Sequence, residues 1–165
     1  MELFEDRENG GFFSTAAGDQ DLILRLKDDY DGAEPSGNSA MAMALARLAR
    51  MTDREDFFKS AERTMEAFGG RLRSGAAGLP QMLVALDFIT GRPREIVLAG
   101  DRDEGFRAML SEIRRRFLPG TVVLRAEDTG RAMPAIGESA TAYVCENFAC
   151  QLPVTRVEDL AEQLQ

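Results

Sequence analysis

Apolar residues recur on nearly every side of one predicted helix in the first third of the chain. Residues 38–50 hold four large apolar side chains and five alanines, and only Arg47 and Arg50 interrupt them. A helix that is apolar all round is normally enclosed by other protein. We therefore predict that residues 38–50 form an inner helix that other protein surrounds.

The next helical stretch has one apolar and one charged face. Its apolar stripe consists of Phe57, Phe58, Ala61, Met65 and Phe68. Residues 52–55 have the spacing of a capping box that opens this helix, and Gly69-Gly70 is expected to end it. A third, mostly apolar helix is predicted from Pro80, a residue favoured in the first turn, to Gly91. The order inner, outer, inner is typical of the helical hairpins of an α/α toroid.

The second half of the chain has a different pattern. Residues 96–99 and 121–124 are short apolar runs typical of buried strands, and residues 103–117 between them have the period of an amphipathic helix. Strand, helix and strand within about 30 residues predict a βαβ unit with a parallel pair. Residues 141–155 are expected to form an extended strand or a hairpin, and a second capping box at residues 155–158 is expected to open a terminal helix.

Two extended pieces near the N-terminus predict a β-hairpin. Residues 12–15 are rich in strand formers, and residues 22–27 alternate in a way that suggests a half-buried strand. The predicted fold is therefore mainly α with an α/β tail. Residues 1–91 contribute the hairpin and the helical hairpins of a partial (α/α)₆ toroid, and residues 92–165 contribute a small βαβ unit.

Charge and composition narrow the classes of partner. The formal net charge is −8, and residues 1–34 hold ten acidic against three basic residues, so the remainder is nearly neutral. Nucleic-acid binding needs a basic face, and we expect no nucleic acid as partner. No run of about 18 apolar residues is present, so no membrane span is expected. The N-terminus lacks the basic and apolar regions of a secretory signal, which favours a cytoplasmic location.

The cysteines and the absence of histidine limit the chemistry. Without histidine, His-dependent triads, His-ligated zinc and imidazole acid/base catalysis are excluded. Cys145 and Cys150 lack the two-residue spacing of a redox motif, and no second pair completes a metal site. In one extended strand they would point to opposite faces. Buried, free thiols in a reducing compartment are therefore favoured over a redox or metal role, and no cofactor or metal is expected.

The acidic loop before the inner helix offers candidate site residues. Glycoside chemistry requires one carboxyl group as acid and another as base or nucleophile, and Asp31 with Glu8 is the candidate catalytic pair. Asp31 is favoured because the glycine after it lets backbone approach a ligand. Glu34, Ser36 and Asn38 are the candidate ligand-binding residues. The alternative is that the acids are solvated loop charges and that Ser36 and Asn38 cap the helix.

Three segments together resemble one protein family. They read GGFFSTA at residues 10–16, DLILRLKDDYDGAEPSGNSAMAMALARL at residues 21–48 and ATAYVCENFACQLPVT at residues 140–155. In this order they resemble the C-terminal end of the spermatogenesis-associated thioredoxin-domain-containing proteins, the bacterial YyaL type.

The resemblance implies a position in a larger protein. Members of this family resemble a thioredoxin-like domain followed by an (α/α)₆ toroid of the six-hairpin glycosidase type, similar to N-acylglucosamine 2-epimerases. The present chain would correspond to the last hairpins and the α/β tail. Residues 31–38 would form a loop at the mouth of the toroid. The thioredoxin-like part is absent, so its redox activity is not carried over.

Three functional hypotheses remain, and the sequence does not decide whether the chain is an enzyme. The first is a segment without catalysis of its own, which packs against the remainder of a larger parent chain or against copies of itself. The alternative is a carbohydrate-binding or carbohydrate-processing site that uses the acidic loop residues. A third hypothesis, thiol redox chemistry, requires Cys145 and Cys150 to lie close enough to bridge.

Overall fold

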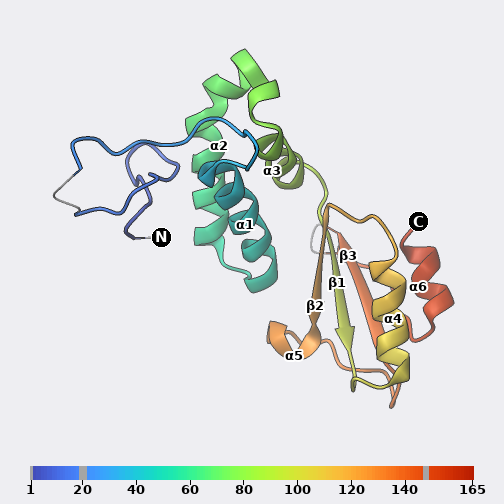
Figure 1. The fold of residues 1–165 in the computed structure, drawn as a ribbon. Helices are drawn as coiled ribbons and strands as arrows, with labels where there is room; N and C mark the ends of the chain where they lie inside the picture. The colour runs from blue at the N-terminus through green and yellow to red at the C-terminus, as the bar shows by residue number, and fades with distance from the viewer. Residues whose placement is uncertain (1, 19–21, 147–148) are drawn as a thin grey trace. The chain divides into compact units, whose positions relative to one another are not determined.

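The computed structural model describes residues 2–18, 22–146 and 149–165, which form a mixed α/β protein with two compact units (Figure 1). We call Met1–Gly91 the helical unit and Arg92–Gln165 the sheet unit. In the part of the chain that is described, no helix is both long and apolar enough to cross a membrane.

Helix α1 (Gly37–Thr52) confirms the predicted helix over residues 38–50. It begins after Ser36, whose Oγ accepts a hydrogen bond from the Ser39 N–H at 3.1 Å. This side chain satisfies one of the N–H groups that have no partner inside the helix. The capping role predicted for Ser36 is therefore confirmed.

The packing of α1 differs from the prediction that other protein surrounds it. One face lies against helices α2 (Glu55–Gly75) and α3 (Pro80–Thr90), and it consists of Asn38, Ser39, Ala42, Leu45, Ala46 and Ala49. The opposite face is open to solvent at Ala40, Ala44 and Leu48, and Leu48 is 40% exposed. Within the described residues, α2 and α3 cover one face of α1, and the opposite face stays exposed.

Helix α2 (Glu55–Gly75) has the predicted apolar stripe, but its two ends differ from the prediction. The capping box at residues 52–55 does not form, because the Thr52 hydroxyl donates to the Leu48 carbonyl at 2.7 Å and thus belongs to the end of α1. Gly69-Gly70 does not end the helix. Leu72 packs against the core beyond the glycines, so burial outweighs the roughly 1 kcal/mol that each helical glycine costs.

Helix α3 (Pro80–Thr90) confirms the third predicted helix, with Pro80 in its first turn and Gly91 directly after its end. A short 3₁₀ turn, η1 (Ala76–Gly78), precedes it. Together with α1 and α2 it forms a core at Ala42, Met65, Phe68, Leu79, Met82 and Ala85.

The predicted N-terminal hairpin is wrong for the residues described. Neither residues 12–15 nor residues 22–27 form a strand, and residues 19–21 between them lie outside the described residues. The Ser14 N–H does donate to the Leu26 carbonyl, but the N–H and the carbonyl of Phe12 bond the side chain of Asn38, so the two segments do not form a ladder. The segment expected to be half-buried is open to solvent, with Ile23 fully exposed.

The sheet unit confirms the βαβ prediction. Strands β1 (Arg94–Ala99) and β2 (Thr121–Arg125) are parallel and are joined through α4 (Glu104–Arg114). Strands β3 (Thr141–Glu146) and β4 (Ala149–Cys150) form the predicted hairpin on the other side of β1, in the order β2-β1-β3-β4.

One face of the sheet packs against α4 and α6 (Val157–Gln163). Arg116 joins these two helices, since its guanidinium donates to the Glu112 carboxylate and to two carbonyls at the end of α6. The predicted helix over 103–117 ends earlier, at Arg114, and Phe117 is 91% exposed. The second capping box, at residues 155–158, does not form, because α6 begins without a side-chain cap. A short helix, α5 (Ala126–Thr129), follows β2.

Candidate functional site

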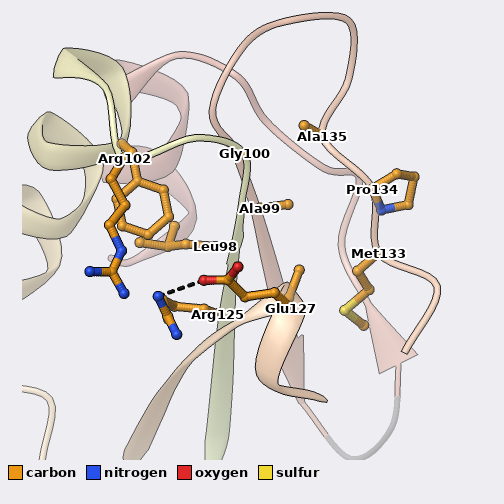
Figure 2. Close-up of a pocket in the computed structure, with 11 residues that line it drawn as sticks. Leu98, Ala99, Gly100, Arg102, Arg125, Glu127, Met133, Pro134 and Ala135 are labelled. Atoms are coloured by element: carbon orange, nitrogen blue, oxygen red, sulfur yellow. Dashed lines mark ion pairs between the residues drawn. The ribbon is translucent and has the colours of Figure 1, made fainter. Parts of the chain in front are cut away.

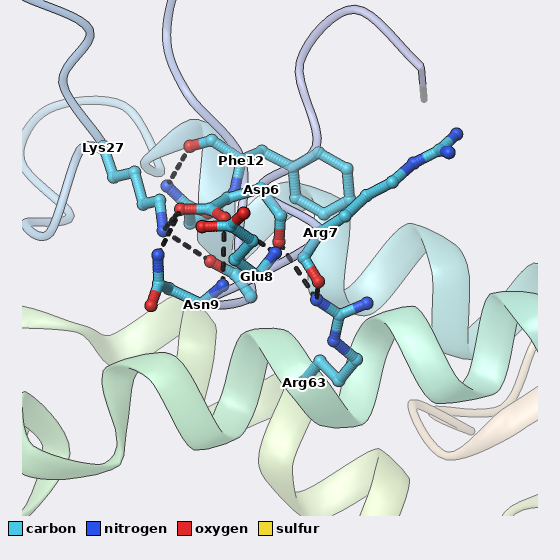
Figure 3. Close-up of polar contacts among 9 residues, drawn as sticks. Asp6, Arg7, Glu8, Asn9, Phe12, Lys27 and Arg63 are labelled. Carbon is cyan, nitrogen blue, oxygen red and sulfur yellow. Dashed lines mark hydrogen bonds and ion pairs between the residues drawn. The ribbon is translucent and has the colours of Figure 1, made fainter.

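A partly buried ion pair organises the N-terminal turn of the helical unit (Figure 3). Lys27 Nζ lies 2.8 Å from Asp6 Oδ2 and donates to the Gly10 carbonyl at 2.6 Å. Asp6 Oδ1 also accepts from the N–H groups of Glu8 and Asn9. The bond from Lys27, followed by that from the Asn9 N–H, holds the pKa of Asp6 far below its usual range. Asp6 is therefore an ionised structural carboxylate.

The same turn rests on helix α2. The Arg63 guanidinium donates to the carbonyls of Asp6 and Arg7. Gly10, at φ +76°, lies so close to α2 that a Cβ atom there would be 2.3 Å from the Arg63 carbonyl oxygen. These contacts fix the N-terminal segment against α2, and within the segment Glu5 and Phe12 form an isolated antiparallel β-bridge.

Asn38 holds the aromatic segment in place from the first turn of α1. Its Oδ1 accepts from the Phe12 N–H at 2.6 Å, and its Nδ2 donates to the carbonyls of Phe12 and Asp28 at 3.0 and 3.1 Å. Asn38 is only 1% exposed, and its side-chain amide forms hydrogen bonds to the backbone of this chain. The structure thus places Asn38 in the wall of a pocket rather than at its opening.

That pocket, which we call the aromatic pocket, has a volume of about 330 Å³. Its lining consists of Phe4, Phe12, Phe13, Ser14, Asp28, Gly37, Asn38 and Met41. The Arg25 guanidinium covers one face of the Phe13 ring, with Cζ 4.0 Å from the ring centroid. Phe4 is 42% exposed, and Asp28 is exposed as well, so the lining of the pocket includes an accessible aromatic residue and an accessible acidic residue.

Asp31, the first predicted catalytic residue, connects the starts of two helices. Its Oδ1 accepts from the Ser36 N–H at 2.8 Å, in front of α1, and its Oδ2 accepts from the Gln81 N–H at 2.8 Å, in the first turn of α3. Burial raises the pKa of this carboxyl, but hydrogen bonds from Ser36, Ser39 and Gln81 outweigh it, so the pKa lies below its ordinary value. Asp31 is only 7% exposed and lies outside the aromatic pocket.

Of the other predicted site residues, Ser36 caps α1, whereas Asn38 bonds the backbone of Phe12 and Asp28 instead of capping the helix as the alternative expected. Glu8 is exposed in the N-terminal turn, and within the described residues it shares no hydrogen-bonding partner with Asp31. Glu34 is exposed, and its carbonyl accepts from the Gly32 N–H. The catalytic roles of Asp31 and Glu8 and the ligand-binding roles of Glu34, Ser36 and Asn38 stay predictions.

Apart from Asn38, the residues that line the aromatic pocket were missed as a site by sequence reasoning. Phe12-Phe13 was interpreted as part of a strand, and Asp28 was one acid among several. The residues that line this pocket come from separate segments of the sequence, and only the fold brings these segments together. Phe4 lies more than 20 residues before Asp28, and no local spacing connects them.

A second pocket, of about 240 Å³, lies in the sheet unit at the carboxyl ends of β1 and β2 (Figure 2). In open α/β sheets, this edge is where ligands commonly bind. Leu98 and Phe106 contribute apolar walls, and Arg125 in an ion pair with Glu127 contributes a polar one. The segment that carries Pro134 closes the side, since the Tyr143 hydroxyl donates to its carbonyl at 2.6 Å.

The prediction that Cys145 and Cys150 are free thiols is wrong. Cys145 and Cys150 form a disulfide, with their Cα atoms 3.9 Å apart. The expectation that they point to opposite faces assumed one continuous strand. The chain instead reverses between β3 and β4, and the register places the two cysteines directly opposite each other.

Fold and pockets define a two-unit, mixed α/β protein with a helical unit and a four-stranded sheet. Spermatogenesis-associated protein 20 of Homo sapiens is similar to it, with 36% identity over 167 residues that cover 93% of this chain and 21% of the relative. The protein of the same name from Rattus norvegicus is 35% identical over equal shares. An uncharacterized protein of Caenorhabditis elegans is 29% identical over 92% of this chain and 22% of its own length. No protein-family model matches.

The chain spans about a fifth of the length of the curated relatives it matches. The resemblance to spermatogenesis-associated proteins that the sequence motifs predicted is confirmed for this segment.

Proposed function

We propose that this chain is a packing segment of a larger protein, in which the helical unit supplies helical hairpins to an α/α toroid that the remaining chain completes. In this role the segment carries no catalysis of its own. The apolar surface that the helical unit leaves uncovered is the observation that carries the proposal.

The exposed apolar side chains of the helical unit lie on three elements. In the extended segment, Ile23 is 103%, Leu24 69% and Leu26 61% exposed. Leu48 on α1 and Val84 on α3 are 40% and 45% exposed. Single exposed apolar residues are common, but a run of large ones in consecutive positions is typical of a surface that other protein covers.

The length of the relatives favours one occupant for this surface. They extend far beyond the matched segment, which is about a fifth of each. The remainder of such a chain is present at high effective concentration, because it is covalently attached. We therefore assign the uncovered surface to another part of the same polypeptide rather than to a separate partner.

Sedimentation of the isolated chain tests this proposal. With its natural cover missing, the chain should self-associate as its concentration rises and should bind a dye that reports exposed apolar surface. The double variant Ile23→Lys/Leu24→Glu should reduce both effects while the helical circular dichroism stays unchanged.

Leu152→Lys is the matched control, because Leu152 is 84% exposed in the sheet unit and lies outside the proposed surface. It should leave the association as in the wild type. A wild-type chain that stays a monomer and binds no dye would contradict the proposal, and so would an equal effect of the control substitution.

The aromatic pocket favours a second candidate function, the binding of a carbohydrate. Sugars present apolar C–H faces that pack on aromatic rings and hydroxyl groups that donate to carboxylates. Phe4 and Asp28, which both line the pocket, are the residues that could offer these two partners. The size of the pocket, about 330 Å³, is at the lower end of the range for small-molecule sites.

Titration of neutral mono- and disaccharides, followed by NMR chemical shifts, tests this second candidate. Phe4→Ala and Asp28→Asn should each abolish the shifts that a binding sugar causes. Glu34→Gln, which changes an exposed carboxylate outside the pocket, should keep them. Binding that is lost with Glu34→Gln but kept with Asp28→Asn would assign the site to the loop instead, against this candidate.

A further inference from the structure

The two halves of the disulfide differ in their access to solvent. Cys145, on β3, is 6% exposed, whereas Cys150, on β4, is exposed. Strand β4 has two residues and is the last strand in the order β2-β1-β3-β4. A thiol in solution can therefore reach Cys150 at the edge of the sheet, while Cys145 is shielded.

We propose that the Cys145–Cys150 disulfide is a thiol–disulfide exchange site that a small thiol such as glutathione opens by attack at Cys150. Exchange depends on access to the attacked sulfur, and the difference in burial therefore selects which sulfur reacts. The inference does not depend on the packing function proposed above, because it concerns the sheet unit alone.

The reaction proceeds in two balanced steps. The thiolate of the small thiol attacks Cys150 Sγ, the S–S bond breaks, and its electron pair leaves on Cys145, which then takes up a proton. A second small thiolate attacks the sulfur of the small thiol in the mixed disulfide and releases the Cys150 thiolate. The protein disulfide gains two electrons, and two small thiols are oxidised to their disulfide.

The fold allows the bond to open without losing the sheet. Strand β3 is paired with β1 along its whole length, from Thr141 to Glu146. Val154 adds a further pair of backbone bonds to Ala142, on the side of β3 that β4 also joins. The core against α4 and α6 uses Ala142 and Val144, which alternate with Cys145 and thus face the other side.

The energetic weight of the disulfide is also small. Its cysteines are five residues apart, and a cross-link that closes a short loop restricts the unfolded chain little. Opening therefore releases only the two-residue pairing of β4, and the remaining three strands stay in register.

Exchange in native buffer tests the proposal on the whole chain. The chain is oxidised with glutathione disulfide and then equilibrated with graded ratios of reduced to oxidised glutathione. It is quenched in acid, alkylated and mapped by peptide mass spectrometry. Two alkylated cysteines should appear as the ratio rises, the glutathione adduct of the intermediate should map to Cys150, and the far-ultraviolet circular dichroism should not change.

Single-cysteine variants separate access from simple reactivity. With Cys145→Ser, the remaining Cys150 should react with glutathione disulfide at least about tenfold faster than Cys145 does in Cys150→Ser, because burial slows the attack. Two chemical outcomes would overturn the proposal: glutathione adducts that map to Cys145, and failure of glutathione disulfide to join the two cysteines. It would also be overturned if the disulfide were reduced only in urea, or if reduction abolished the circular dichroism signal of the sheet.

Discussion

At the scale of single residues, Gly10 and Gly18 both adopt a positive φ but have different surroundings. Gly10 lies against the backbone of α2, where a Cβ atom would be 2.3 Å from the Arg63 carbonyl oxygen, whereas a Cβ atom at Gly18 would meet nothing within 4 Å. Position 10 therefore requires glycine both for its positive φ and for its contact with α2, whereas position 18 requires glycine for its positive φ alone.

Gly10→Ala should therefore destabilise the protein by about 3 kcal/mol or more, since the left-handed conformation and the clash add together. Gly18→Ala, as the control, should cost about 1 kcal/mol from the conformation alone. Urea unfolding of both variants measures the difference. Equal costs would show that the N-terminal turn does not rest on α2.

Asp31 adds a polar connection between the starts of α1 and α3 to the apolar core that they share. Asp31→Ala leaves the Ser36 and Gln81 N–H groups without their acceptor and should cost about 2–3 kcal/mol. Asp31→Asn keeps an acceptor and should cost less. Glu34→Gln, an exposed neighbour, should stay within about 0.5 kcal/mol.

The lowered pKa of Asp31 adds a pH dependence with a definite sign. A carboxyl group whose pKa is lower in the folded state stabilises that state at pH values above its unfolded pKa of about 4. This stability is lost as the pH falls through the folded pKa. The difference in unfolding free energy between wild type and Asp31→Asn should therefore narrow below about pH 4, and a difference that stays constant would contradict the assignment.

At the scale of elements, α2 continues through a pair of glycines that the sequence marks as a stop. Gly70 is exposed inside the helix, and a Cβ atom there would meet nothing within 4 Å. The helix is kept by packing on both sides of the pair, at Phe68 and Leu72.

Gly70→Ala should accordingly stabilise the protein by about 0.5–1 kcal/mol, because alanine loses less conformational entropy in a helix. Gly70→Pro should destabilise it by about 3 kcal/mol, because proline removes a helical N–H and clashes with the preceding turn. Thermal unfolding of the two variants gives both values. If the helix ended at Gly69, the proline would be tolerated.

At the scale of the whole molecule, the two units have separate cores. The core of the sheet unit is built entirely from residues between Ile96 and Leu164, and the disulfide lies in the same unit. By the chain-entropy relation, a loop this short is stabilised by about 2 kcal/mol on cross-linking. Most of the stability of the unit must then come from its core.

Residues 92–165 expressed alone should therefore fold and unfold cooperatively in urea, with dispersed NMR signals. Reduction should lower their unfolding free energy by no more than about 2 kcal/mol. A fragment without dispersed signals would show that the sheet unit depends on residues 1–91.

The sequence by itself determined α1, α2, α3 and the βαβ unit, because a periodic apolar pattern tells which face of an element is buried. It also placed Ser36 at the start of α1, since capping is a local interaction. The resemblance to spermatogenesis-associated proteins likewise came from motifs that can be read along the chain.

Only the tertiary structure decided which segments meet. Asp31 accepts a hydrogen bond from the Gln81 N–H, 50 residues further along the chain. The Phe12 N–H donates to the Asn38 side chain instead of to a hairpin partner, and Cys145 lies opposite Cys150. The period of apolar residues shows which side of a helix or strand is buried. A pocket or a disulfide depends instead on how the chain reverses direction and on which distant segments come into contact. For that reason the helices could be predicted from the sequence, but the aromatic pocket and the disulfide could not.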